Sequence, residues 1–163
     1  MPVSAFCQAM QDSLVGQAVR GSSWMFPAIE TTHLTAMVLL VGSITVFDLR
    51  LLGLTMRGQS VSQLAERLLP CTWFAFGIMI LTGALMFSSD SVEKYCPNPA
   101  FHIKLVLLLL AGLNMSVFHF TVHRSVAEWD EAHVTPLWAK LVGSVSVLLW
   151  AGVVFAGRWI GFA

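Results

Sequence analysis

The sequence predicts an all-α integral membrane protein, a four-helix transmembrane bundle with a short N-terminal interfacial helix. Of its 163 residues, 56% are hydrophobic and 11% are charged. A water-soluble domain carries about 25% charged residues, so this composition excludes an ordinary soluble globule. The apolar residues gather in four runs, each near the roughly 20 residues that a helix needs to cross a bilayer. The runs are continuous and do not alternate with polar residues, which excludes a β-barrel.

The four predicted spans form one domain that covers residues 1–163. They run over about 27–52, 68–87, 100–122 and 136–159. A proline stands at or just before each start: Pro27, Pro70, Pro99 and Pro136. Proline suits the first helical turn because its missing N–H has no intrahelical partner there. We therefore expect each proline to mark the N-terminal end of a span, and short loops to make neighbouring spans antiparallel.

Residues 1–26 precede the first span and do not form a cleavable signal, because they lack a basic start followed by a short apolar core. Phe6, Met10 and Leu14 recur every four residues among polar side chains. This spacing predicts a short helix that lies in the membrane interface. A partly disordered tail is the alternative.

The charge distribution bears on partners and orientation. Nine basic and nine acidic residues give zero net charge, so the sequence lacks the excess of basic residues that is typical of nucleic-acid binding. An even number of spans places both termini on one side. The opposite side carries five cationic residues against four on the terminal side. The positive-inside rule then predicts that both termini lie on the outer side and that the arginine-containing loops face the cytoplasm. Cys7 and Cys96 fall on that outer side, where either a disulfide or two free thiols fit the sequence.

Ionisable residues are costly inside a membrane and usually face a bundle interior or a functional cavity. Spans two and four contain essentially none, so the first and third spans are the pair predicted to build a site. Counting 1.5 Å per residue places these groups in two layers. The outer layer comprises Glu30, His33 and His102, with Lys104 nearby; the inner layer comprises Asp48, His119 and His123.

Two histidines on different spans predict the cofactor. His33 and His102 lie at similar depths, and imidazoles from two helices are a common axial ligand pair for haem b in a bundle. Lys104 or Arg20 is then suited to neutralising the haem propionates, and Glu30 to supporting a histidine ligand without binding the iron itself. The leading hypothesis is a b-type cytochrome-like subunit that exchanges electrons with quinone or a redox partner protein.

Two other functions fit the same residues. Glu30 and His33 stand one turn apart, so with His102 they form a candidate copper site. His119, His123 and Asp48 form a second, weaker candidate, and the two layers would suit a metal-handling transporter. The third hypothesis is a cofactor-free accessory subunit in which these groups sit at the interface without ligand roles. No nucleophile–base pair or phosphate loop supports a hydrolase or nucleotide enzyme. Homo-oligomerisation is left open.

Several segments resemble an uncharacterised bacterial family of small four-span inner-membrane proteins. They are WMFPAIETTHLTAMVLLVGSITVFDLRLLGL, RLLPCTWFAFGIMILTGALMF, NPAFHIKLVLLLLAGLN and AGRWI, which together cover most of the chain. The layout is more loosely similar to cytochrome b561-type subunits and to the membrane domain of copper-resistance protein D. The positions that match the family pattern are Glu30, His33, Asp48, Arg50, His102 and Lys104. The resemblance implies the fold and an inner-membrane location.

Overall fold

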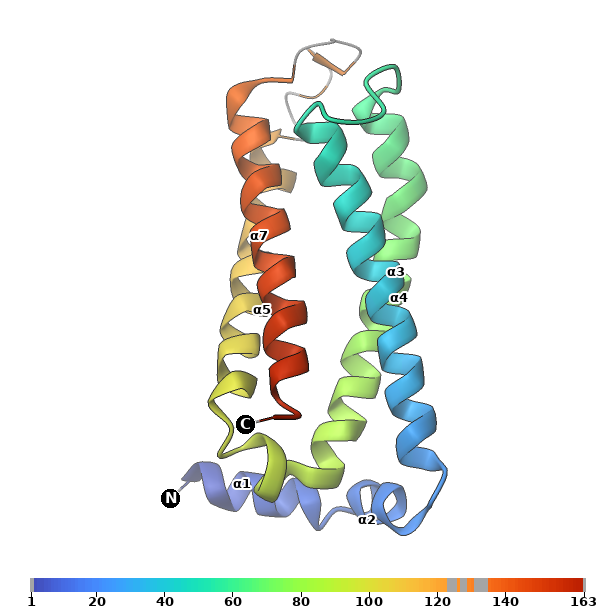
Figure 1. The fold of residues 1–163 in the computed structure, drawn as a ribbon, viewed down its shortest axis with the longest axis vertical. Helices are drawn as coiled ribbons and strands as arrows, with labels where there is room; N and C mark the ends of the chain where they lie inside the picture. The colour runs from blue at the N-terminus through green and yellow to red at the C-terminus, as the bar shows by residue number, and fades with distance from the viewer. Residues whose placement is uncertain (1, 123–125, 127–128, 131–134, 163) are drawn as a thin grey trace.

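Four long helices run side by side as an antiparallel bundle in the computed structural model, which describes residues 2–122, 126, 129–130 and 135–162 (Figure 1). They are α3 (Met25–Leu51), α4 (Val61–Asp90), α5 (Pro99–Val117) and α7 (Leu137–Trp159). With their short extensions, all four are long and apolar enough to cross a membrane. The predicted all-α four-helix bundle is confirmed.

Among the described side chains, many large apolar ones lie on the outside of the bundle and several polar ones lie inside, which is the reverse of a soluble protein. Large apolar residues along the bundle are exposed, including Val38, Leu109 and Leu148. Several polar residues within the same helices are buried, among them His33 and Asp48. Apolar side chains on the outside and polar ones inside are expected when the solvent is lipid. The chain is a multi-pass membrane protein.

Proline marks three of the four helix starts, as predicted, but not the fourth. Pro27 is the third residue of α3, Pro99 is the first of α5, and Pro136 directly precedes α7. The prediction for Pro70 is wrong, because α4 begins nine residues earlier at Val61 and passes through this proline. Its true start is capped by Ser60, whose hydroxyl oxygen accepts from the Gln63 N–H at 3.2 Å.

Two helices depart from regular α geometry at their C-terminal ends. The π-helical turn η1 (Ser91–Tyr95) follows α4, and a second one, η2 (Phe118–Val122), follows α5. A π turn inserts an extra residue and rotates everything that follows it. His119 lies in η2, so an angle of 100° per residue counted from His102 does not give its direction.

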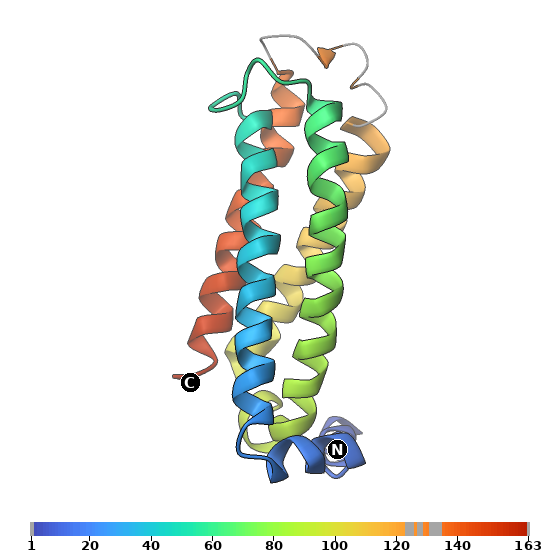
Figure 2. The ribbon, with the colours of Figure 1, turned by 90° about the vertical axis from the view of Figure 1, so that its right-hand side faces the viewer.

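The N-terminal segment forms two helices instead of the single one predicted. They are α1 (Pro2–Gln11) and α2 (Leu14–Gly21), and both lie across one end of the bundle (Figures 1 and 2). A disulfide joins Cys7 to Cys96, with the two Cα atoms 6.6 Å apart. The Ser91 hydroxyl donates to the Cys7 carbonyl oxygen at 2.7 Å. These links fix the segment to the bundle, and we call this the disulfide end.

The opposite end, which we call the loop end, is organised by a buried arginine. Arg50 is 1% exposed and its Nε donates to the Gln59 carbonyl oxygen at 2.9 Å. Asp130 accepts hydrogen bonds from the backbone N–H (2.8 Å) and the hydroxyl of Ser62 in the first turn of α4. Partial burial alone would raise the pKa of Asp130, but the Ser62 hydrogen bonds and the Arg50 charge lower it below its ordinary value.

The helices pack as two pairs. α3 packs along α4, and α5 packs along α7, while α3 and α7 join the pairs. Among the described residues, α3 and α5 come close at few points, so the first and third spans are diagonal and not adjacent as predicted. Contacts between α4 and α5 are also sparse. The space on this side of the bundle holds two cavities.

Candidate functional site: two cavities between α3, α4 and α5

The first cavity lies toward the disulfide end and is named here after His33. It has a volume of about 260 Å³ and is lined mainly by apolar residues of α3, α4 and α5. The ionisable side chains among its lining residues are those of His33 of α3, Lys104 of α5 and Tyr95 of η1. An apolar pocket with a few polar groups is the usual form of a small-molecule site.

The hydrogen bonds around His33 fix which ring nitrogen carries the proton. His33 is 8% exposed, and its Nδ1 lies 2.8 Å from the Thr82 Oγ1 of α4. Thr82 in turn donates its hydroxyl hydrogen to the Ile78 carbonyl oxygen at 2.6 Å. With its hydrogen on the Ile78 carbonyl, the Thr82 oxygen is an acceptor, which matches the His33 tautomer that carries its hydrogen on Nδ1. In the neutral ring, this leaves Nε2 with a free lone pair.

Glycine allows the close approach of His33 to α4. A Cβ atom on Gly83 would lie 3.4 Å from the Cε1 of His33. Gly83 follows Thr82 directly, so one residue supplies the hydrogen-bond acceptor and the next supplies the space for the ring. The dipeptide therefore holds the imidazole against α4 at the wall of the cavity.

Lys104 brings a cation to the same cavity from α5. Its side chain is half-buried and crosses to α7, where a Cβ on Gly157 would lie 3.4 Å from the Lys104 Nζ. Within the described part of the chain, no carboxylate pairs with this ammonium group and no hydrogen bond is formed by it. The three N–H groups of Lys104 are therefore available to an acceptor on a ligand.

Aromatic rings close this cavity toward the disulfide end. Phe101 of α5 stacks on Phe87 of α4 at 5.5 Å between ring centroids, and Tyr95 of η1 lies 5.4 Å from Phe101. Phe6 of α1 also stacks with Phe87, at 6.3 Å between ring centroids. The helix α1 that the disulfide holds is thus part of the wall behind the His33 cavity.

The second cavity lies toward the loop end and is named after Asp48. It has a volume of about 380 Å³ and receives residues from α3, α4, α5, η2 and α7. Leu40, Phe76 and Leu108 line both cavities and so stand between them. His33 and Asp48 are 15 residues apart on α3, which separates the two sites by about 22 Å along the bundle.

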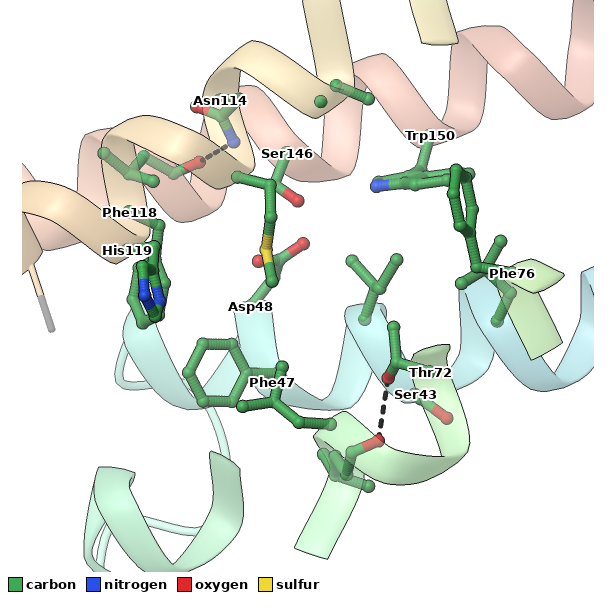
Figure 3. A pocket seen from close by; sticks show the side chains of 18 of the residues that line it. Ser43, Phe47, Asp48, Thr72, Phe76, Asn114, Phe118, His119, Ser146 and Trp150 are labelled. Atoms are coloured by element: carbon green, nitrogen blue, oxygen red, sulfur yellow. Dashed lines mark hydrogen bonds between the residues drawn. The ribbon is translucent and has the colours of Figure 1, made fainter. Parts of the chain in front are cut away.

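Asp48 is the carboxylate of the second cavity. It is 4% exposed, and the Ser146 side chain of α7 lies next to it (Figure 3). Its carboxylate oxygen Oδ2 is buried and has no hydrogen-bond partner among the described residues. Asp48 makes no ion pair with Arg50, whose Nε and Nη1 point to Gln59 and Thr135 instead. A buried carboxylate with an open acceptor is costly unless a ligand or water satisfies it.

The predicted haem ligands are not brought together in the described chain. His33 lines the cavity between α3, α4 and α5, whereas His102 is exposed on α5 and lines neither cavity. Glu30 is also exposed and is absent from both linings. The physical reason is the diagonal placement of α3 and α5. The structure therefore does not place His33 and His102 at one cavity, and their assignment as axial haem ligands stays a prediction.

Two of the three residues predicted for the inner layer lie at one cavity. Asp48 and His119 both line the second cavity, so the structure brings these two together. His123 lies outside the described residues. Within the part of the chain that the structure describes, no group of three or more His, Cys, Asp or Glu side chains is placed to hold a metal ion. The copper-site hypothesis therefore stays a prediction as well.

Residues on α4 and α7 complete both cavities and were missed by counting ionisable groups. Thr82 and Gly83 position His33, while Ser146 and Trp150 face Asp48 (Figure 3). Spans two and four contain few charged residues, so a count of ionisable groups predicts no site residue on them. Hydroxyl and small residues inside apolar spans are the signal that would have found them, because such residues mark helix contacts in membranes.

Comparison with known families places almost the whole chain in one group. Residues 8–163 match the model of a family of unknown function, DUF6644, and the chain belongs to this family. No curated protein matches the chain. No solved structure matches it either. The looser likeness to cytochrome b561-type subunits and to copper-resistance protein D stays a prediction.

Proposed function

We propose that this DUF6644 member is a membrane subunit that binds a quinone-class carrier in the His33 cavity and takes part in electron transfer. The observation that carries the proposal is the pairing of His33 with Lys104 at one apolar, aromatic cavity between α3, α4 and α5. Quinones dissolve in the bilayer and present a flat ring with polar oxygens, so they require an apolar space with few polar groups.

The two polar groups complement both redox forms of such a ligand. An oxidised quinone presents carbonyl oxygens, which accept hydrogen bonds from the Lys104 ammonium. A reduced quinol presents hydroxyl groups, which can donate to the free Nε2 of His33. A site with one strong donor and one acceptor can hold the ring in either form.

The position of the cavity also supports this ligand class. The cavity lies where α4 and α5 make sparse contacts, and it is partly open to the surroundings. A lipid-soluble molecule can therefore enter from the side. We further propose that the disulfide end faces the periplasm of a bacterial inner membrane, because the Cys7–Cys96 bond persists in an oxidising compartment.

Calorimetric titration of a short-chain benzoquinone into the protein in lipid nanodiscs tests the proposal. We expect saturable binding to the unmodified protein. Lys104→Met should weaken it about tenfold or more, since a hydrogen bond from a charged group contributes about 1.5–3 kcal/mol. His102→Ala is the matched control, because His102 lies on the same helix but lines neither cavity. Equal affinity in the Lys104→Met variant would overturn the proposal.

The redox centre that serves the quinone is tested separately. An absorption spectrum of the purified protein reveals haem b by a Soret band and sharp α and β bands in the reduced state. If haem is bound, His33→Ala and His102→Ala should each alter the spectrum, whereas His119→Ala should not. Haem that is unaffected by both substitutions would exclude the predicted axial pair without bearing on quinone binding.

A further inference from the structure

The Asp48 cavity is chemically different from the quinone site proposed above, and its polar groups select another ligand. Asp48 is the carboxylate among the described lining residues, and its Oδ2 is both buried and unpartnered. In Figure 3 the carboxylate points into the space between α3 and α7, toward the side chains of the opposite wall. The open atom is an acceptor, so its partner must supply a hydrogen or a positive charge.

Two hydroxyl groups in the lining add acceptors to this wall, because each hydroxyl hydrogen is already used. The Thr72 hydroxyl donates to the Leu68 carbonyl oxygen at 2.8 Å, and the Ser43 hydroxyl donates to the Leu39 carbonyl oxygen at 2.7 Å. Their oxygens keep lone pairs. The Ser146 hydroxyl is directed to Asp48 itself. The Trp150 indole N–H is a donor in the lining, but it carries no charge to balance a carboxylate.

The rest of the cavity is apolar and aromatic. Phe47, Trp73, Phe76 and Trp150 line its walls together with leucine and isoleucine side chains. A bare inorganic cation would leave most of this space of about 380 Å³ empty. An organic cation with an apolar body fills it instead, and the ring faces favour positive charge through cation–π attraction.

We propose that the Asp48 cavity binds a lipophilic ammonium compound, with its charged N–H groups on the Asp48 carboxylate and its apolar body against the aromatic walls. Such a ligand satisfies the open Oδ2 atom and pairs the buried charge at the same time. This site is independent of the quinone site, since different ionisable groups serve the two cavities.

Phenethylamine is a suitable probe, and 2-phenylethanol is its neutral counterpart with nearly the same shape. Both are titrated at pH 7 into the unmodified protein in nanodiscs of uncharged lipid, by calorimetry. We expect saturable binding of the amine that is at least tenfold tighter than binding of the alcohol. This comparison requires no variant, so it stands even where a substitution impairs folding. Equal affinities, or no saturable amine binding, would overturn the proposal.

Two variants then assign the site. Asp48→Asn keeps the shape of the side chain and should weaken amine binding at least tenfold. Glu66→Gln is the matched control, because it removes a carboxylate from an exposed position on α4 outside both cavities. The His33→Ala variant should leave the amine affinity unchanged, so failure of the quinone proposal is distinguishable. Unchanged amine affinity in Asp48→Asn would exclude Asp48 as the binding group.

Discussion

The two cavities occupy the same side of one bundle but offer opposite chemistry. The His33 cavity combines a lysine ammonium with an imidazole whose Nδ1 is hydrogen-bonded to Thr82, whereas the Asp48 cavity holds a carboxylate with an open oxygen. They also differ in how they are supported. The disulfide end is held by α1, α2 and the Cys7–Cys96 bond, while the loop end depends on Arg50 and Asp130. Changes at one end should therefore leave the other end largely intact.

The largest expected effect comes from the disulfide. Cys96→Ser opens a loop of 89 residues, and loss of a native disulfide typically costs about 2–4 kcal/mol. Part of that cost should appear as weaker quinone binding, since α1 backs the His33 cavity through Phe6 and Phe87. Thermal unfolding measures the loss of stability, and titration with the benzoquinone measures the loss of binding. Cys71→Ser is the control, because Cys71 is a free exposed thiol. Amine binding at Asp48 should not change, and a parallel loss there would show that the ends are coupled.

A matched pair of threonines separates the two cavities more sharply. Thr82→Val removes the acceptor for His33 Nδ1 and leaves a buried donor unpaired, which costs about 1–3 kcal/mol. Thr72 bonds to its own helix at the Asp48 cavity, so Thr72→Val should be close to neutral for stability. Chemical denaturation measures each variant. Equal destabilisation by the two substitutions would mean that the His33–Thr82 bond has no special role.

The two threonines illustrate how much of the structure could be predicted from the sequence. Four spans, their antiparallel order and the presence of polar layers at two depths follow from hydropathy and spacing. The grouping of Asp48 with His119 also followed from depth. The depth of a residue in the membrane does not show which helices are neighbours. In the structure, α3 packs on α4 and α7 instead of α5. The partners of His33 therefore lie on α4, and His102 is left exposed.

Local geometry accounts for the other differences. Pro70 lies inside α4 because a membrane helix can tolerate a proline when its neighbours satisfy the freed carbonyl. The π turn at Phe118–Val122 rotates His119 away from the line predicted for a regular helix. Neither feature has a reliable signature in a single sequence.

The attachment of α2 is tested by a glycine pair. A Cβ on Gly16 would lie 2.5 Å from the Ser88 carbonyl oxygen, whereas a Cβ on Gly21 meets nothing within 4 Å. Gly16→Ala should therefore force α2 away from α4 and cost about 1–3 kcal/mol. Gly21→Ala should be neutral or slightly stabilising. Thermal unfolding of both variants distinguishes them. A harmless Gly16→Ala would show that α2 does not pack tightly on the bundle.

The smallest expected effect concerns Asp130 at the loop end. Asp130→Ala removes the hydrogen bonds to Ser62 at the start of α4, and loss of such a cap costs about 0.5–1 kcal/mol at neutral pH. The pKa of Asp130 is lower in the folded protein than its ordinary value of 3.8. Its contribution to the free energy of unfolding is therefore complete above pH 3.8 and is lost as the pH falls through the lowered pKa. The difference in unfolding free energy between the unmodified protein and Asp130→Ala should thus be present at pH 7 and shrink below about pH 4. Glu66→Ala, an exposed carboxylate one turn further along α4, should show no such difference at either pH. A gap that persists unchanged in acid would mean that Asp130 acts through packing and not through its charge.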